Sequence, residues 1–175
     1  MKPEHKKVLK NTAEAIVGLC TLTLLCGLLF SPLHPPWTGE AAAKGHCKWN
    51  LKQIAVAFRI WSEDNGGQYP FNVSTNQGGT REYRQLRSDG FDGGGAFHLR
   101  AMSNELGTQK VLICRSDQLK EPAIDFQHLE PDNITYQIHS GINVNTNHPG
   151  QILAVCPIHG HTLTLDGTVH LKGKL

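Results

Sequence analysis

Apolar side chains recur at helical spacing between residues 47 and 70. Because they return every three or four residues, they line one face of an α-helix, and polar residues occupy the rest of each turn. The pattern ends at Asp64-Asn65-Gly66-Gly67, a typical C-terminal signal, and Pro70 cannot continue a helix. We expect this helix to begin near Thr38 or Gly39. It should bury a packing spine against the rest of the domain, made of Leu51, Ile54, Phe58 and Trp61.

Beyond this helix, the pattern predicts an irregular middle followed by short strands. Residues 71–95 are rich in Gly, Asn, Ser and Thr, which predicts a long loop, and residues 96–106 again have helical spacing. Asp166-Gly167 is a strong hairpin turn. Short apolar or alternating runs predict strands at 111–114, 134–138, 152–155, 161–165 and 168–171. The predicted fold class of the folded part is therefore α+β, with a small antiparallel C-terminal sheet that covers the spine.

An uncharged, apolar run near the N-terminus follows a segment rich in lysine. Residues 13–33 approach the length that a membrane span needs, and the lysines favour a cytoplasmic N-terminus. We therefore predict a cytoplasmic basic segment at 1–12, a transmembrane helix in the inner membrane at 13–33, and an exported domain at 34–175, periplasmic or external. The alternative is a cleaved signal peptide with Ala41-Ala42-Ala43 as its cleavage site.

Composition argues against several functions. The formal net charge of +2 provides no electrostatic basis for binding nucleic acid. Ser74, Ser103 and Ser140 lack the sequence context of a catalytic nucleophile. Gly93-Gly94-Gly95 lacks the Lys-Ser/Thr pair of a phosphate-binding loop. We therefore predict no catalytic residues, no enzymatic activity, no nucleic-acid partner and no small-molecule substrate.

The five cysteines divide into two groups. Cys20 and Cys26 lie in the apolar N-terminal run, where cysteine behaves as a small hydrophobic residue. Cys47, Cys114 and Cys156 lie in the segment predicted to be exported, where a structural disulfide is common. Because Cys114 and Cys156 each follow a predicted strand, the two are disulfide candidates, and Cys47 would be left unpaired.

Zinc is the alternative use of these cysteines. The segment Cys156-Pro-Ile-His159-Gly-His161 presents three candidate zinc ligands, and Cys114 could supply a fourth. A single Cys-x-x-His without a second clear pair is a weak zinc signal, so the disulfide and the metal both stay open.

A second candidate metal site lies in the glycine-rich loop around residue 90. Asp89 and Asp92 could offer oxygen ligands to calcium. The motif is not an EF-hand, and aspartates in turns usually bond their own backbone. We therefore predict no required cofactor, with calcium and zinc as the two alternatives.

Several motifs together resemble one family. The run C-x-x-N-L-K-Q-I-x-x-A-F-R-I-W at Cys47–Trp61 is similar to that of pseudopilin-like proteins, which are related to type II secretion components and type IV pilins. The same family has counterparts of D-N-G followed by P-F-N-V-S-T-N-Q-G-G-T, of M-S-N-E-L at Met102–Leu106, and of C-P-I-H-G with a later D-G-x-V. The prepilin cleavage signal of the family is not matched, since residues 10–14 read Lys-Asn-Thr-Ala-Glu.

The resemblance implies a fold and a role. In that family one N-terminal helix is half membrane anchor and half packing spine for a C-terminal sheet, and some members hold a structural calcium ion. It implies a non-enzymatic, membrane-anchored subunit of a type II secretion or type IV pilus-like assembly, which self-associates or binds other pilin-like subunits. The alternative function is an anchored periplasmic or surface module that binds a ligand or a metal.

Overall fold

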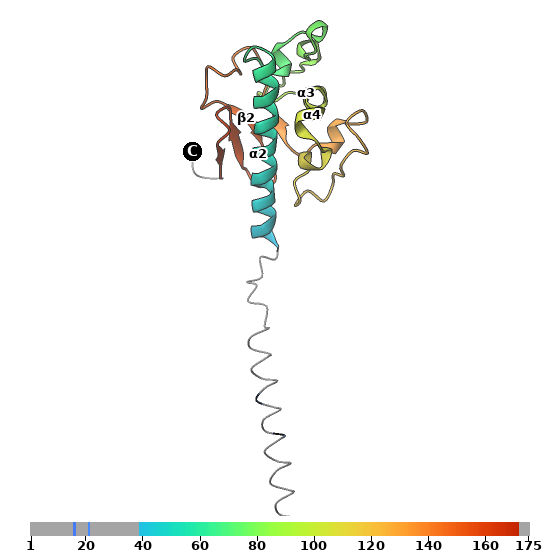
Figure 1. The fold of residues 1–175 in the computed structure, drawn as a ribbon, viewed down its shortest axis with the longest axis vertical. Coiled ribbons are helices and arrows are strands. Elements are labelled where there is room, and N and C mark those ends of the chain that lie inside the picture. Colours follow the sequence, from blue (N-terminus) through green and yellow to red (C-terminus); the bar gives the residue numbers. More distant parts are fainter. Residues whose placement is uncertain (1–15, 17–20, 22–38, 172–175) are drawn as a thin grey trace, which may run out of the picture. The chain divides into compact units, whose positions relative to one another are not determined.

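The long helix α2, Glu40–Asp64, is the central element of the domain (Figure 1). The computed structural model describes residues 16, 21 and 39–171. Gly39 precedes the helix, and Gly66 and Gly67 follow it with φ angles of 64° and 78°. These positive φ angles suit glycine and end the helix where the sequence pattern stops.

Short helical segments connect α2 to the sheet. Two further α-helices, α3 at Gly95–Ala101 and α4 at Ser103–Leu106, follow a long irregular stretch. One 3₁₀ segment, η4 at Gln109–Leu112, takes the first half of the run predicted as a strand at 111–114, and the second half forms no strand either. An apolar run of four residues does not by itself distinguish strand from helix. The other 3₁₀ segments are η1 at Pro70–Asn72, η2 at Thr75–Gln77, η3 at Arg81–Tyr83 and η5 at Pro131–Asn133.

The sheet is an antiparallel meander of four short strands in the order β1-β2-β3-β4. The strands are β1 at Gln137–Ile138, β2 at Ile152–Val155, β3 at Thr162–Thr164 and β4 at Val169–His170. Gln137 pairs with Val155, and Val155 pairs with Thr162 across the next ladder. Asp166 and Gly167 form the turn between β3 and β4, with Gly167 at a φ of 79°.

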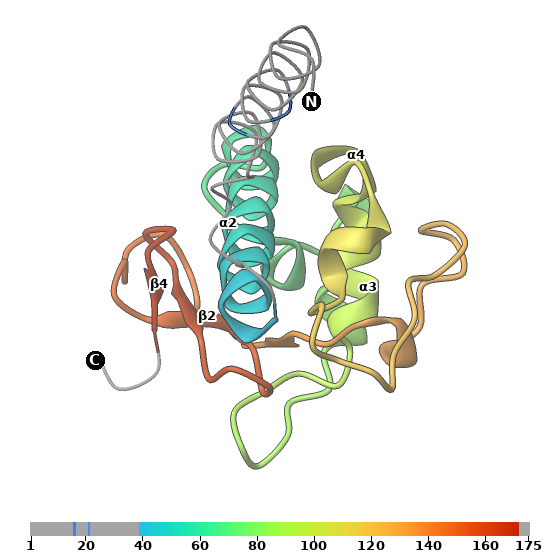
Figure 2. The same ribbon diagram turned by 90° about the horizontal axis from the view of Figure 1, so that it is seen from below.

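Helix α2 lies between the sheet and the pair α3–α4, as both ribbon views show (Figures 1 and 2). All four spine residues are buried: Leu51, Ile54, Phe58 and Trp61. The ring of Phe58 packs against Tyr69 and Phe71, with ring centroids 5.5 and 6.0 Å away. The segment just after the helix therefore covers part of the spine that we expected the sheet to cover.

The predicted overall architecture, headed by a transmembrane helix, requires correction. Among the described residues, no helix is both long enough and apolar enough to cross a membrane. Helix α2 is long, but Lys44, Lys48, Arg59 and Glu63 are spread along it, and charged groups are costly in hydrocarbon. The predicted span at 13–33 lies outside the described residues, apart from Ile16 and Thr21. The structure instead shows one long helix, short helices and a four-stranded antiparallel sheet.

Candidate metal centre

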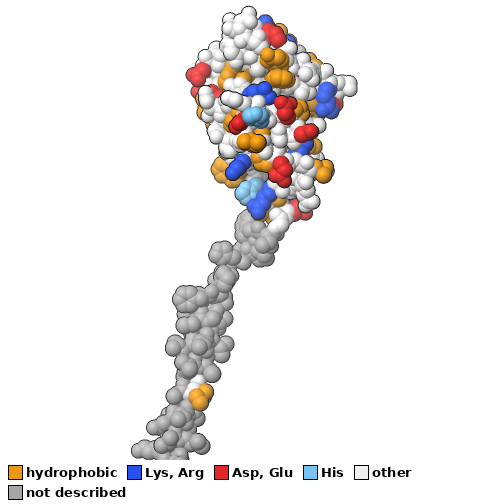
Figure 3. Space-filling view, turned by 90° about the vertical axis from the view of Figure 1, so that its right-hand side faces the viewer, with side chains coloured by type: hydrophobic (Ala, Val, Ile, Leu, Met, Phe, Trp, Pro, Cys, Tyr) orange, Lys and Arg blue, Asp and Glu red, His pale blue; other side chains and the backbone are white. Residues whose placement is uncertain are grey.

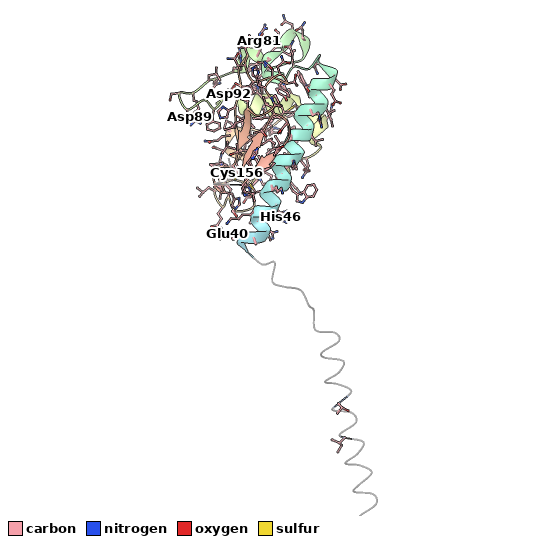
Figure 4. All side chains as sticks on the ribbon, turned by 90° about the vertical axis from the view of Figure 1, so that its left-hand side faces the viewer. Glu40, His46, Arg81, Asp89, Asp92 and Cys156 are labelled. Carbon is pink, nitrogen blue, oxygen red and sulfur yellow. The ribbon has the colours of Figure 1, made fainter. Side chains whose placement is uncertain are left out.

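Four side chains from separate parts of the chain converge inside the domain. They are Cys47, Cys114, Cys156 and His159, whose ligand atoms all lie within 4.8 Å of one another. All four residues are buried. Figure 4 places Cys156 beside the N-terminal half of α2. Three sulfur atoms and one imidazole nitrogen in one buried cluster could hold a metal ion.

Three different elements bring the cysteines together: a helix, a 3₁₀ segment and a strand. Cys47 lies on α2 one helical turn before Leu51, so it faces the same way as the spine. Cys114 follows η4, and its backbone N–H donates to the hydroxyl of Thr135 over 3.0 Å. Cys156 follows β2 directly.

A tight turn sets His159 over Cys156. The N–H of Gly160 donates to the carbonyl of Cys156 over 2.8 Å, and Gly160 has a φ of 65°. The N–H of Cys156 donates to the carbonyl of His161 over 2.8 Å, which closes the connection from β2 to β3. The N–H of His159 also points at Cys156 Sγ, 3.5 Å away.

The imidazole of His159 is oriented for ligation through Nδ1. This atom lies 3.4 Å from Cys114 Sγ and 3.9 Å from Cys156 Sγ. Ligands at about 2.3 Å (sulfur) and about 2.0 Å (nitrogen) from a tetrahedral ion are separated by about 3.5 Å, so these distances match such a shell. The opposite nitrogen, Nε2, lies 3.2 Å from the hydroxyl of Ser116. Metal-bound histidines commonly use their second nitrogen in this way.

The three thiols have different acidities. The hydrogen bond from Cys47 lowers the pKa of Cys156 to about 5, although burial acts in the opposite direction, and the N–H groups of His159 and Ile158 contribute. Hydrogen bonding to Cys156 and burial both raise the pKa of Cys47. Burial is the main cause that raises the pKa of Cys114. The cluster thus holds one ready thiolate, and a bound cation would favour two more.

The candidate disulfide is not formed in the structure. Cys114 and Cys156 are free cysteines, and so is Cys47. The strand ends do bring Cys114 near Cys156, but Cys47 and His159 share the same space. Three thiols around one imidazole are arranged as a ligand set and not as an isolated sulfur pair.

The cluster in the structure differs by one residue from the zinc ligands that the sequence suggested. Cys156 and His159 lie in the cluster together with Cys114, but His161 does not. The ring of His161 stacks on that of His159, with centroids 5.3 Å apart. Cys47 takes the fourth place. Its position four residues before Leu51 puts it on the spine face, a signal that the sequence contained.

The candidate calcium site is not assembled. Asp89 is exposed and pairs with Arg87 at 2.5 Å, whereas the side chain of Asp92 is fully buried. The carboxylate of Asp92 already accepts hydrogen bonds from four protein groups: His98, Ser140 and the backbone N–H groups of Gln85 and Gly94. Both oxygens of Asp92 are therefore used within the protein.

These bonds make Asp92 a pH-sensitive support of the fold. Burial by itself raises the pKa of Asp92, but the hydrogen bonds from His98, Ser140 and the backbone outweigh it and hold the pKa well below its usual value. In the unfolded chain this carboxyl titrates near a pKa of about 3.9. The stabilisation is therefore complete above that pH and is lost as the pH falls towards the native pKa.

We expect Asp92→Asn to destabilise the domain by about 3 kcal/mol at neutral pH, because an amide places a donor against existing donors. Urea unfolding from pH 7 to pH 3 would measure this, and the difference from wild type should narrow below about pH 4. The matched control is the exposed Asp89→Asn, which should cost under about 0.5 kcal/mol. A difference that does not depend on pH would contradict the role given to the ionised Asp92.

Comparison with known proteins finds no relative of this chain. No family model matches the chain, and no curated protein or solved structure matches it either. Any function assigned to this chain must therefore rest on its own residues and on the geometry of the candidate metal centre.

Proposed function

We propose that the four-residue cluster binds one zinc ion as a structural centre, and that the domain it stabilises has no enzymatic activity. The observation that carries this proposal is the closed set of ligands. Cys47, Cys114, Cys156 and His159 supply four donors, the number that tetrahedral zinc takes in structural sites. Catalytic zinc sites keep a position open for water or substrate, whereas this set is complete and buried.

The ligand types favour zinc over the other common ions. Thiolate sulfur is a soft ligand that suits zinc, copper(I) and iron–sulfur clusters, and calcium and magnesium prefer oxygen. An imidazole together with three thiolates at tetrahedral spacing is a recurring zinc set. In this proposal the ion ties together α2, the segment after η4 and the turn between β2 and β3.

The other buried polar cluster also supports a non-enzymatic domain. Asp92, His98 and Ser140 are the residue types of a hydrolytic triad, but their contacts differ from one. Ser140 Oγ and His98 Nε2 both bond the carboxylate of Asp92, and His98 Nδ1 bonds Thr80 Oγ1, so both imidazole nitrogens are occupied and neither is left for a contact with the Ser140 hydroxyl. A nucleophile needs that contact to be activated. All three are buried and are therefore best explained as structural.

We further infer that the domain serves a pseudopilin-like subunit of a secretion or pilus-like assembly. The motif resemblance supports this, and so does the outer face of α2. Trp49, Val56 and Ile60 lie on that face, with 69%, 53% and 42% of their surface exposed. Val56 and Ile60 follow Trp49 at about two and three helical turns, so the three form a stripe that another subunit could cover. Figure 3 shows one face of the domain, on which hydrophobic side chains are interspersed with charged ones.

Site-specific crosslinking would test the subunit role. A photo-crosslinking residue at Gln53, between Trp49 and Val56 on the exposed face of α2, should give crosslinks to other copies or to related subunits in cells. The same residue at Ile124, which is 88% exposed in a loop, is the control and should give none. Crosslinks from neither position would favour the second candidate, a monomeric metal-binding module, which the metal centre alone would explain.

Cobalt substitution would test the metal centre. We expect the full-length chain to bind one cobalt(II) ion with the spectrum of a tetrahedral thiolate site. His159→Ala should weaken or abolish that spectrum, because it removes the nitrogen ligand. His128→Ala, at an exposed histidine bonded to Asp125, is the matched control and should leave it unchanged. An octahedral spectrum in wild type would contradict the proposed site.

A further inference from the structure

A buried hydroxyl without a partner lies beside the metal centre. Among the described residues, five buried side-chain polar atoms lack a hydrogen-bond partner, and the hydroxyl of Tyr136 is one of them. Tyr136 is only 3% exposed, so water does not readily satisfy this group. A buried donor without an acceptor costs about 1–3 kcal/mol, and a native structure rarely leaves one without a reason.

Strand register places Tyr136 directly opposite Cys156. Gln137 pairs with Val155 and Ile138 with Ala154 in the antiparallel ladder of β1 and β2. Continuing this register by one residue pairs Tyr136 with Cys156, and directly opposed residues point to the same face of a sheet. The preceding residue, Thr135, accepts the N–H of Cys114. The segment at 135–136 therefore runs between two of the three cysteines.

The face to which Tyr136 points is the one that α2 covers. Of the side chains on α2, those of Cys47 and Asn50 lie near enough to the Tyr136 hydroxyl to influence its pKa. The side-chain amide of Asn50 donates through Nδ2 to the carbonyl of Ile113 over 2.9 Å, and its Oδ1 is a neutral acceptor. The sulfur of Cys47 is thus the acceptor that would gain most charge if a metal were bound.

We propose that the Tyr136 hydroxyl donates a hydrogen bond to the Cys47 thiolate in the zinc-loaded protein and positions that ligand. This inference rests on the proposed zinc centre. Three thiolates and a neutral imidazole around Zn²⁺ leave a net charge of −1 on the centre, mostly on sulfur, and hydrogen bonds to charged acceptors are the strong ones. Partners of this kind orient metal ligands and raise affinity for the ion. An ordinary tyrosine, with a pKa of about 10, keeps its proton at neutral pH and can donate.

The test is Tyr136→Phe in the full-length chain, which removes the hydroxyl and keeps the ring. We expect zinc affinity, measured by competition with a chromophoric chelator, to fall about 10–100-fold while the stoichiometry stays at one ion per chain. The sulfur-to-metal charge-transfer band of the cobalt form should also move to lower energy, because the thiolate loses a stabilising donor. Lost packing alone would not move that band.

Tyr69→Phe is the matched control, because Tyr69 is equally buried but packs against Phe58 and Phe71. It should leave both the affinity and the band unchanged. If wild type binds zinc and Tyr136→Phe changes neither quantity, or if Tyr69→Phe changes both equally, the hydrogen bond is wrong and the zinc centre stands. If wild type takes up neither zinc nor cobalt, the zinc centre itself fails, and the hydrogen bond fails with it.

Discussion

Removal of zinc by a strong chelator is expected to unfold the domain at 39–171 at room temperature. Structural zinc sites contribute apparent binding free energies of about 10–16 kcal/mol at neutral pH. Whole domains are stable by only about 5–15 kcal/mol, so losing the ion removes stabilisation as large as the total. The reason is local as well: without the ion, three thiols and an imidazole buried inside the domain lose their common partner.

Circular dichroism during chelation of the full-length chain would measure this, with recovery on adding zinc back. Cys114→Ser should reproduce the effect of the chelator, because it removes one ligand from the buried set. Cys20→Ser is the matched control, since Cys20 lies far from the ligands in the sequence, and it should respond to the chelator like wild type. A chain that keeps its helical signal and melting temperature without metal would contradict a structural role for zinc.

Truncation of Phe58 to alanine is expected to lower the free energy of unfolding by about 3–5 kcal/mol. Phe58 is 1% exposed and lies at the centre of the spine, where it packs edge-on to Tyr69 and tilted to Phe71. Its removal takes apolar contacts from α2 and from the segment after it, and it leaves a cavity that close-packed neighbours cannot fill completely.

Val56→Ala is the matched control on the same helix. Val56 is 53% exposed, so its truncation should cost under about 0.5 kcal/mol. Lys52 is a poorer control than its place on the polar face suggests, because its Nζ donates to the carbonyl of Gly167 over 2.6 Å. Zinc-saturated urea unfolding would compare the variants. If Phe58→Ala kept full stability but abolished self-association, the spine would be an intersubunit surface and the packing described here would be wrong.

Sequence patterns predicted best those parts of the fold that have strong local signals. Helix α2 was predicted to begin near residue 39 and to stop at residues 64–67, and it spans Glu40–Asp64, because an apolar stripe, an alanine run and a glycine pair all act locally. The strand at 152–155 and the turn at Asp166-Gly167 have similarly clear signals. The transmembrane architecture was inferred from the length of an uncharged apolar run and the lysines that precede it, and no described helix supports it.

The candidate metal centre was only partly predictable, because its four residues come from three distant segments. Cys156 and His159 are close in sequence, so they were recognised together, along with Cys114 as a possible fourth ligand. His161 was as plausible as His159 from spacing alone; the turn at Gly160 decides between them by directing only His159 to the cysteines. The spacing of Cys47 from Leu51 places it on the buried face of α2, but which residues it meets there depends on how α2 packs on the sheet, which no local pattern contains.

The measurement that tests the central claim most directly is X-ray absorption at the zinc edge on the purified, zinc-loaded full-length chain. We expect one zinc ion per chain, with about three sulfur ligands at about 2.3 Å and about one nitrogen ligand at about 2.0 Å. Cys47→Ser should lower the sulfur count or abolish binding. A chain purified without metal that refuses zinc and carries a disulfide between Cys114 and Cys156, or zinc surrounded mainly by oxygen, would contradict the account.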